Sequence, residues 1–205
     1  MLVICLDLEG VLIPEIWINV AEITGINELR RTTREEPDYD LLMEYRLGIL
    51  DKHDIKIEDI TSIIDSMEPV EGAIEFLQGL ESKWPALILS DTFSQFAKPM
   101  MSKLGNPTLF CHTLAIDDTG RIEGWNIRCE DHKRKTVEAL GKLNFKVIAS
   151  GDSYNDTSML SSANAGILFK PPDNVIAEFP QFPVVNDFEG LMWAIESSAS
   201  DMGEL

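Results

Sequence analysis

Short apolar runs that end at polar residues recur along this chain of 205 residues, and segments of helical character separate them. The runs cover residues 2–6, 86–89, 146–149 and 165–169, and their length and branched side chains are typical of strands buried on both faces. The helical segments cover residues 71–82, 93–104, 133–143 and 154–163. Because this alternation requires crossover connections between strands, it predicts an α/β fold with a mostly parallel sheet.

Two segments depart from the alternation. Residues 114–128 contain two strand-like arms around Asp117-Asp118-Thr119-Gly120, a pattern typical of a β-hairpin. Residues 14–69 hold no convincing buried strand, and Pro14 and Pro69 suit the entry to and the exit from a helical segment. Two helical faces are expected there, one carrying Ile16, Val20 and Ile23 and the other Leu42, Tyr45 and Ile49. The pattern therefore predicts a small helical domain inserted after the first strand.

The composition is that of an ordinary globular chain with an acidic excess. Asp and Glu number 35 against 17 Lys and Arg, which gives a formal charge of -18. Such a chain repels nucleic acid and anionic membranes, so neither is an expected partner. If the substrate carries phosphate, a few basic side chains and a metal ion must supply positive charge locally. We expect order throughout, except in the Ser- and Asp-containing tail after Ile195.

The ends of the sequence and its cysteines bear on location. The first apolar run stops at Asp7 and lacks a basic region or a cleavage site, so no signal peptide is expected, and no run is long enough to span a membrane. Three widely spaced cysteines form no disulfide framework. These features favour a cytoplasmic protein with reduced thiols. The oligomeric state stays open, with a homodimer as one option.

Two carboxylates follow the first predicted strand. Asp7 and Glu9 are two residues apart, so they share a face in extended backbone, and Gly10 frees the loop beyond. Adjacent carboxylates repel each other unless a cation lies between them or one is protonated. The pair suits a nucleophile beside a general acid/base. The alternative is a strand end with solvated acids.

Polar residues also follow two later strands, and ligands of parallel sheets bind beyond these carboxyl ends. Ser90-Asp91-Thr92 offers a hydroxyl to a phosphoryl oxygen, although a helix N-cap is the alternative. Asp152 and Asp156 follow Gly151 and offer the oxygen ligands that Mg²⁺ prefers, although an acidic helix cap explains them equally well. Lys133 could screen a transferring phosphoryl group, or it could be one solvated lysine among several.

The conjunction of these motifs, in this order, resembles the haloacid dehalogenase superfamily of aspartyl-phosphate enzymes. The four sequence blocks of that family match residues 7–11, Ser90, Lys133 and residues 151–156. The resemblance implies a Rossmann-like core formed by residues 1–13 and 70–205, with a helical cap domain formed by residues 14–69. It also implies a catalytic Asp7 nucleophile.

Within the superfamily, the chain is similar to the phosphoserine phosphatase branch. The resemblance assigns Glu15 to the amino group and Arg46 to the carboxylate of phosphoserine, where the plain alternatives are a first-turn acid and an exposed helix charge. Two departures are similar to members that also transfer the phosphoryl group to homoserine. Glu9 replaces the usual second aspartate, and Asp91-Thr92 follows Ser90 where glycines are usual.

The resemblance implies a set of roles. Mg²⁺ is the expected cofactor, with Asp7, Asp152 and Glu9, through its backbone or side chain, as metal-binding residues and Asp156 behind them. Glu9 is the expected proton donor and acceptor, and its pKa must rise toward neutral for that work. The remaining expected substrate-binding residues are Ser90, Asp91, Lys133 and Asn155.

Three alternatives stay open at this point. A phosphatase of the same superfamily for another small phosphate ester or a nucleotide fits the same motifs. A receiver-like signalling module also carries acidic strand ends, but it needs neither an inserted cap nor Glu9. A catalytically silent scaffold is disfavoured because every chemical position is filled. His53, His112 and His132 are scattered in the sequence, and we expect them to be structural or exposed.

Overall fold

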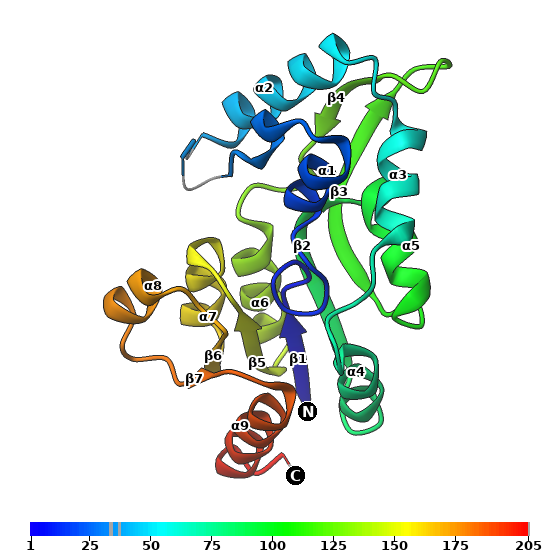
Figure 1. Cartoon of the computed structure of the whole chain (residues 1–205). Coiled ribbons are helices and arrows are strands. Elements are labelled where there is room, and N and C mark those ends of the chain that lie inside the picture. The colour runs from blue at the N-terminus through cyan, green and yellow to red at the C-terminus, as the bar shows by residue number, and fades with distance from the viewer. Residues whose placement is uncertain (33–34, 37, 205) are drawn as a thin grey trace.

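The computed structural model describes residues 1–32, 35–36 and 38–204 (Figure 1). Within these residues the strands form a seven-stranded sheet in the order β4-β3-β2-β1-β5-β6-β7. All pairs are parallel except β3 with β4. The strands are β1 (Leu2–Leu6), β2 (Ala86–Phe93), β3 (Leu109–Ile116), β4 (Ile122–Asn126), β5 (Lys146–Gly151), β6 (Ala165–Phe169) and β7 (Val184–Val185). The predicted α/β fold with a mostly parallel sheet is confirmed.

Strand β1 lies at the centre of the sheet, and its five residues are all buried. Leu2, Ile4 and Leu6 belong to one apolar cluster, while Val3 and Cys5 belong to another. Since successive side chains of a strand point to opposite faces, the two clusters are the two faces of the sheet. An uninterrupted apolar run is what a strand covered on both sides requires.

Helices cover both faces. On the face of Ile4 the core includes residues of α4 (Ala73–Glu81), α5 (Ser94–Lys103) and α9 (Phe188–Asp201). The opposite face is covered by residues of α6 (His132–Lys142), α7 (Thr157–Ser162) and α8 (Asp173–Glu178). A short 3₁₀ turn, η2 (Tyr154–Asp156), precedes α7. The result is a three-layer arrangement with the carboxyl ends of β1, β2 and β5 side by side (Figure 1).

The segment between residues 14 and 69 is helical where the structure describes it, which excludes residues 33, 34 and 37. It contains α1 (Ile16–Thr24), η1 (Asn27–Arg30), α2 (Tyr39–Lys52) and α3 (Ile57–Ser66). Its two ends adjoin, because the amide of Val70 donates to the carbonyl of Leu12 at 3.0 Å. In Figure 1, α1 and α2 lie above the carboxyl ends of the strands, and α3 lies at the side, next to α5. Adjoining ends are what an insertion into a core requires.

The predicted hairpin is present as β3 and β4, and it lies against these helices. The Arg121 guanidinium pairs with Asp51 of α2 through two hydrogen bonds of 2.7 and 2.6 Å. The Trp125 indole N–H donates to Asp40 at 3.0 Å, and the amide of Ile57 donates to the carbonyl of Gly120 at 2.9 Å. The hairpin therefore extends from the sheet and supports α2 and the start of α3.

Three expectations require correction. Strand β2 continues to Phe93, so Ser90-Asp91-Thr92 lies within the strand, and its pairing with β3 is irregular there. Ile23 and Tyr45 are exposed, because the apolar faces of α1 and α2 are narrower than their sequence pattern indicated. Residues 196–201 of the predicted tail form the last turns of α9, and Leu205 lies outside the described residues. Among the described residues, no helix has the length and apolar character needed to cross a membrane.

Candidate active site

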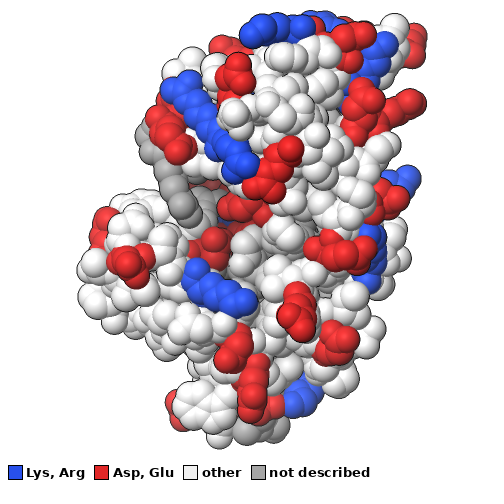
Figure 2. Space-filling model, viewed as in Figure 1, with Lys and Arg blue, Asp and Glu red and all other residues white. Residues whose placement is uncertain are grey.

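A cavity of about 290 Å³ lies between the carboxyl ends of the strands and the helices above them. Figure 2 shows acidic atoms inside the hollow between these two parts of the molecule. The residues that line the cavity are Asp7, Glu9, Glu15, Trp17, Ile18, Thr32, Tyr39, Arg46, Ser90, Asp91, Thr92, Phe93, Lys133, Asp152, Ser153, Tyr154 and Asn155. Every predicted site residue except Asp156 is in this set.

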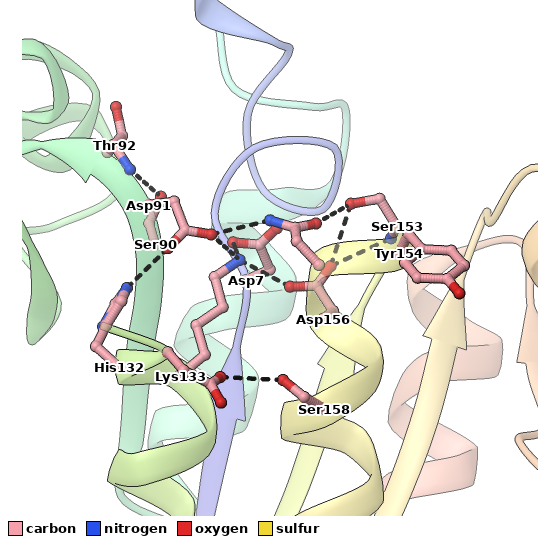
Figure 3. A network of polar contacts seen from close by, with 12 residues as sticks. Asp7, Ser90, Asp91, Thr92, His132, Lys133, Ser153, Tyr154, Asp156 and Ser158 are labelled. Carbon is pink, nitrogen blue, oxygen red and sulfur yellow. Dashed lines mark hydrogen bonds and ion pairs between the residues drawn. The ribbon is translucent and has the colours of Figure 1, made fainter. Parts of the chain in front are cut away.

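Lys133 joins two carboxylates beneath the cavity. It begins the first turn of α6, and its side chain is 4% exposed, which excludes the solvated-lysine alternative. Its ammonium donates to Oδ1 of Asp7 at 2.8 Å and to Oδ1 of Asp156 at 2.7 Å (Figure 3). Burial alone would lower the pKa of Lys133, but Asp156 and Asp7 hold it well above its ordinary value. The lysine is therefore a fixed positive charge.

The carboxyl group of Asp7 is buried at the end of β1. Burial and then the charge of Asp156 raise its pKa well above the ordinary value, against the opposing effect of Lys133. A carboxylate in this position is costly without a further cation. The side chain faces the cavity, where it could attack an electrophile.

Asp156 makes contacts that fit both interpretations left open by the sequence, namely an acidic cap and a group next to the proposed metal-binding residues. Its Oδ2 accepts hydrogen bonds from the amides of Asp152 and Ser153 at 3.1 and 3.2 Å, as an acidic cap does. Its Oδ1 accepts the bond from Lys133. A Cβ on Gly151 would lie 2.3 Å from Cγ of Asp156, so this close approach requires glycine. With its oxygens occupied, Asp156 positions the groups around it.

Asp7, Asp152 and Asp156 form a group whose oxygens lie within 4.8 Å of one another. Burial, followed by repulsion from Asp156 and Glu15, raises the pKa of Asp152 to about 7. Gly10 has φ +80°, and a Cβ there would lie 2.5 Å from the Asp152 carboxylate, so the loop after β1 closes onto this group. Clustered carboxylate oxygens that repel one another fit a hard divalent cation such as Mg²⁺. The side chain of Glu9 lies outside this group.

Glu9 faces the cavity from the side of the helices. Its Oε2 accepts a hydrogen bond of 2.8 Å from the amide of Ile16, and the Thr92 hydroxyl also bonds it. Burial, with a smaller contribution from Glu15, raises the pKa of Glu9 to about 7. A carboxyl group with a pKa near neutral can both give and take a proton at neutral pH.

Arg46 lines the helix side of the cavity from α2. It is 6% exposed, so the exposed-charge alternative is excluded. Its guanidinium stacks 4.5 Å from the centre of the Trp17 ring and donates to the carbonyl of Arg31 at 2.9 Å. Its Nε is buried without a partner among the described residues, and burial lowers its pKa to about 10. An unpaired buried N–H beside a cavity indicates a ligand that the site is built to receive.

Glu15 also lines the helix side of the cavity. It is exposed and occupies the N-cap position of α1, where its side chain makes no capping hydrogen bond. Tyr39, from the start of α2, reaches across to the sheet and donates its hydroxyl to the carbonyl of Asp91 at 3.1 Å. The helix side thus offers a cation and an anion to a ligand.

Ser90, Asp91 and Asn155 lie on the sheet side. Ser90 is 2% exposed, and its hydroxyl accepts a bond of 3.2 Å from the amide of Thr92. The N-cap alternative is excluded, since Phe93 is the N-cap residue of α5. Asn155 donates to Oδ2 of Asp91 at 2.9 Å.

Thr92, His112 and His132 are among the polar residues beside the site that the sequence did not predict. Thr92 contacts Glu9, and its spacing of two from Ser90 in an extended strand was the available signal. His112 and His132 are 3% and 1% exposed, and both lie next to Asp91. Nothing in the sequence connects these two histidines, because β3 and α6 bring them together from positions 20 residues apart (132 − 112).

Comparison with known proteins gives consistent similarities. A family model of haloacid dehalogenase-like hydrolases matches residues 1–164. The chain is 57% identical over 187 residues to "Phosphoserine phosphatase ThrH" of Pseudomonas aeruginosa, covering 91% of each chain. It is 56% identical to a phosphoserine phosphatase of Pseudomonas syringae pv. tomato, covering 91% of this chain and 79% of that one.

Solved structures are similar in fold. A phospho-aspartyl intermediate analogue of phosphoserine phosphatase matches with a TM-score of 0.76 and 20% identity, over 94% of this chain and 97% of that one. A substrate-bound phosphoserine phosphatase complex matches with the same TM-score, identity and coverage. At this identity the likeness concerns the fold alone.

Proposed function

The chain belongs to the haloacid dehalogenase-like hydrolase family, and we propose that it hydrolyses O-phosphoserine with Mg²⁺ through an aspartyl phosphate on Asp7. Homoserine is the proposed second acceptor of the phosphoryl group. The observation that carries the proposal is one cavity that joins Asp7 and Lys133 on the sheet side to Arg46 and Glu15 on the helix side. One end suits a phosphoryl group and the other suits an amino acid.

Asp7 and Asp152 would hold the Mg²⁺, and Asp156 would position them. The donor set supports this assignment, since it consists of carboxylate oxygens within 4.8 Å of one another. The backbone carbonyl near Glu9 is a further proposed ligand. When bound, the cation supplies charge neutralisation for the phosphoryl oxygens.

Asp7 is the proposed nucleophile. Its carboxylate would attack phosphorus in line, forming one P–O bond as the bond to the serine oxygen breaks. Lys133, which already contacts Asp7 at 2.8 Å, would neutralise a phosphoryl oxygen in the transition state. The Ser90 hydroxyl would donate to another oxygen from its buried position on β2.

Glu9 is the proposed general acid and base. Protonated, it would give its proton to the departing serine oxygen; ionised, it would take a proton from the water that attacks the aspartyl phosphate. A pKa of about 7 supports both states at neutral pH. The hydrogen bonds from Ile16 and Thr92 hold its carboxyl group in place between the two halves of the site.

The amino-acid end of the substrate is proposed to lie against α1 and α2. The Nε of Arg46, which has no partner among the described residues, would donate to the substrate carboxylate, and the exposed Glu15 would accept from its ammonium group. Homoserine carries the same two groups, so it would bind in the same orientation with its hydroxyl toward Asp7. Closure of the proposed cap, residues 14–69, over the core of residues 1–13 and 70–205 would exclude water.

A magnesium-dependent assay tests this proposal. The enzyme is supplied with phosphoserine, with and without homoserine, and inorganic phosphate and phosphohomoserine are both counted. We expect phosphate alone without homoserine, and phosphohomoserine at the expense of phosphate with it. An unchanged yield of phosphate, with no phosphohomoserine, in the presence of homoserine would exclude homoserine as an acceptor. Turnover of other phosphate esters but not of phosphoserine would contradict the assignment of Arg46 and Glu15.

A further inference from the structure

A polar cluster supports Asp91 from behind the cavity. Nε2 of His132 lies 3.2 Å from Oδ1 of Asp91, and Nε2 of His112 lies 3.7 Å from the same oxygen. The two rings are buried and meet edge to face, with centroids 4.7 Å apart. Figure 3 shows His132 directed at Asp91 from the start of α6. Because two buried imidazoles approach the same carboxylate oxygen, we infer a polar interaction there in addition to packing.

Arg128 determines which nitrogen of each ring carries the proton. Its backbone amide donates to Nδ1 of His112 at 3.3 Å, and its guanidinium lies 3.2 Å from Nδ1 of His132. An amide and a guanidinium can only donate, so both Nδ1 atoms must accept. The ring protons are therefore on the Nε2 atoms, and both N–H groups face Asp91.

A metal ion is the competing interpretation of this cluster. The ligand atoms of Asp91, His112 and His132 lie within 4.8 Å of one another, and Nε2 of His132 makes no well-directed hydrogen bond. A metal-bound histidine, however, normally donates its second N–H to an acceptor. Here Arg128 presents donors to both Nδ1 atoms, so the cluster is built to hold an anion, the carboxylate, rather than a cation.

The other side of Asp91 faces the proposed phosphoryl site. Its Oδ2 accepts from the Asn155 amide at 2.9 Å and lies 3.6 Å from the Lys133 ammonium. The side chain is 40% exposed, into the cavity, and Tyr39 holds its backbone carbonyl. Asp91 therefore connects the buried histidines to Lys133, which contacts Asp7, and to Asn155, which lines the same cavity.

We propose that Asp91, held by His112 and His132, is a positioning residue that sets Asn155 and Lys133 against the phosphoryl group. The two imidazoles, whose Nε2 atoms lie 3.2 and 3.7 Å from Oδ1, hold this oxygen by electrostatic contact, which leaves Oδ2 to orient the amide and the ammonium. This inference rests on the proposed function, because it assigns the transferred group to that end of the cavity.

The charge state of Asp91 agrees with this role. Burial alone would raise its pKa, but the Lys133 ammonium and the N–H groups around the carboxylate hold it well below the usual value. A permanent carboxylate beside a phosphoryl site repels the substrate unless it is useful there. Holding two donors in a fixed geometry is such a use, since small displacements of reacting groups cost large factors in rate.

The test compares two replacements at each histidine. Gln keeps an N–H donor near the position of Nε2, whereas Leu removes it. We expect H112L and H132L to lower kcat for phosphoserine by about ten- to a hundredfold, and H112Q and H132Q to recover most of that loss. His53, an exposed residue at the end of α2, provides the matched control H53Q, with unchanged kinetics.

Two further measurements separate the alternatives. Thermal denaturation identifies variants that have merely lost stability; Leu variants that melt earlier but keep wild-type kcat while folded would overturn the proposal, as would Gln variants no better than Leu. Calorimetry with inorganic phosphate and MgCl₂ does not depend on the substrate. If Asp91 has the proposed positioning role, inorganic phosphate binds more weakly to the Leu variants even if phosphoserine is not the substrate. Stoichiometric Zn²⁺ binding that H112L abolishes would overturn the proposal and identify Asp91, His112 and His132 as a metal site.

Discussion

At the scale of single residues, the proposed catalytic role of Glu9 has a cost in stability. Its pKa rises from 4.5 to about 7, chiefly because the carboxyl group is buried. The folded protein therefore binds this proton more tightly than the unfolded chain. The stabilisation from the protonated form is complete below pH 4.5 and is lost as the pH rises through about 7.

Glu9→Gln tests both consequences. Gln keeps an acceptor for the Ile16 amide but has no charge to bury, so the variant should be more stable than the wild type above pH 7. The difference is at most ~3 kcal/mol and should vanish near pH 4.5. Turnover should fall by about 10²–10⁴-fold. Chemical denaturation across this pH range, with chelator present, and steady-state kinetics with Mg²⁺ measure the two effects.

A stability difference that is the same at pH 4.5 and pH 8 would show that the Glu9 carboxyl group titrates normally. A mild loss of activity would assign the proton transfer to another group.

The residues that lie at strand ends were predictable, and those brought together by packing were not. Asp7, Ser90 and Asp152 follow apolar runs, and adjacent parallel strands bring such positions to one edge of the sheet. His112 lies within β3 and His132 lies at the start of α6. Their common contact with Asp91 depends on how α6 packs against the sheet, which no local pattern encodes.

At the scale of elements, the last helix shows a limit of composition. The Ser- and Asp-containing tail predicted disorder, but Leu191, Ile195 and Ala199 recur at helical spacing and are fully buried. Phe188 stacks on Phe76 and Phe169 at centroid distances of 4.8 and 5.0 Å. The periodicity was present in the sequence, and the small residues around it obscured it.

Two substitutions in α9 measure this packing. Leu191→Ala removes a side chain that is 0% exposed, so we expect a loss of about 2–5 kcal/mol in the free energy of unfolding. Trp193→Ala, two residues away, removes a side chain that is 69% exposed and should change stability by less than about 0.5 kcal/mol. Urea denaturation of both variants gives the comparison. Equal losses would contradict the orientation of the helix.

The helical character of residues 14–69 was predicted by the absence of buried strands there, but the contacts that support these helices were not. Arg121 and Trp125 of the β3–β4 hairpin contact α2 through side chains that carry no special motif. The hairpin itself was recognisable from its turn residues. Its contact with a segment about 70 residues earlier is a property of the assembled fold.

At the scale of the whole molecule, the net charge of -18 matters most at the cavity, because acidic side chains line it. Acidic atoms occupy the hollow in Figure 2, so the proposed phosphoserine would enter a site of its own sign. Lys133 and Arg46 supply positive charge at the two ends. The proposed divalent cation would offset the remaining negative charge of the carboxylates.

The proposed Mg²⁺ site should therefore compete with protons. The pKa of Asp152 rises to about 7, mainly through burial and the charge of Asp156, and a carboxyl group must lose its proton before it binds the metal. We expect Mg²⁺ affinity to weaken below pH 7 by up to about tenfold per pH unit for each proton released. Calorimetric titration at several pH values, in buffers of different ionisation enthalpy, measures affinity and proton release together. An affinity independent of pH between 5 and 7.5 would contradict this site.

The covalent role of Asp7 is the central claim, and trapping the intermediate tests it most directly. The wild-type enzyme and Asp7→Asn are mixed with phosphoserine and Mg²⁺, quenched in acid and examined by mass spectrometry of the intact chain and its peptides. We predict that a phosphoryl group is added to the peptide containing Asp7 in the wild type and that Asp7→Asn, folded but inactive, shows none. Turnover by Asp7→Asn, or a phosphoryl group on another residue, would contradict the account.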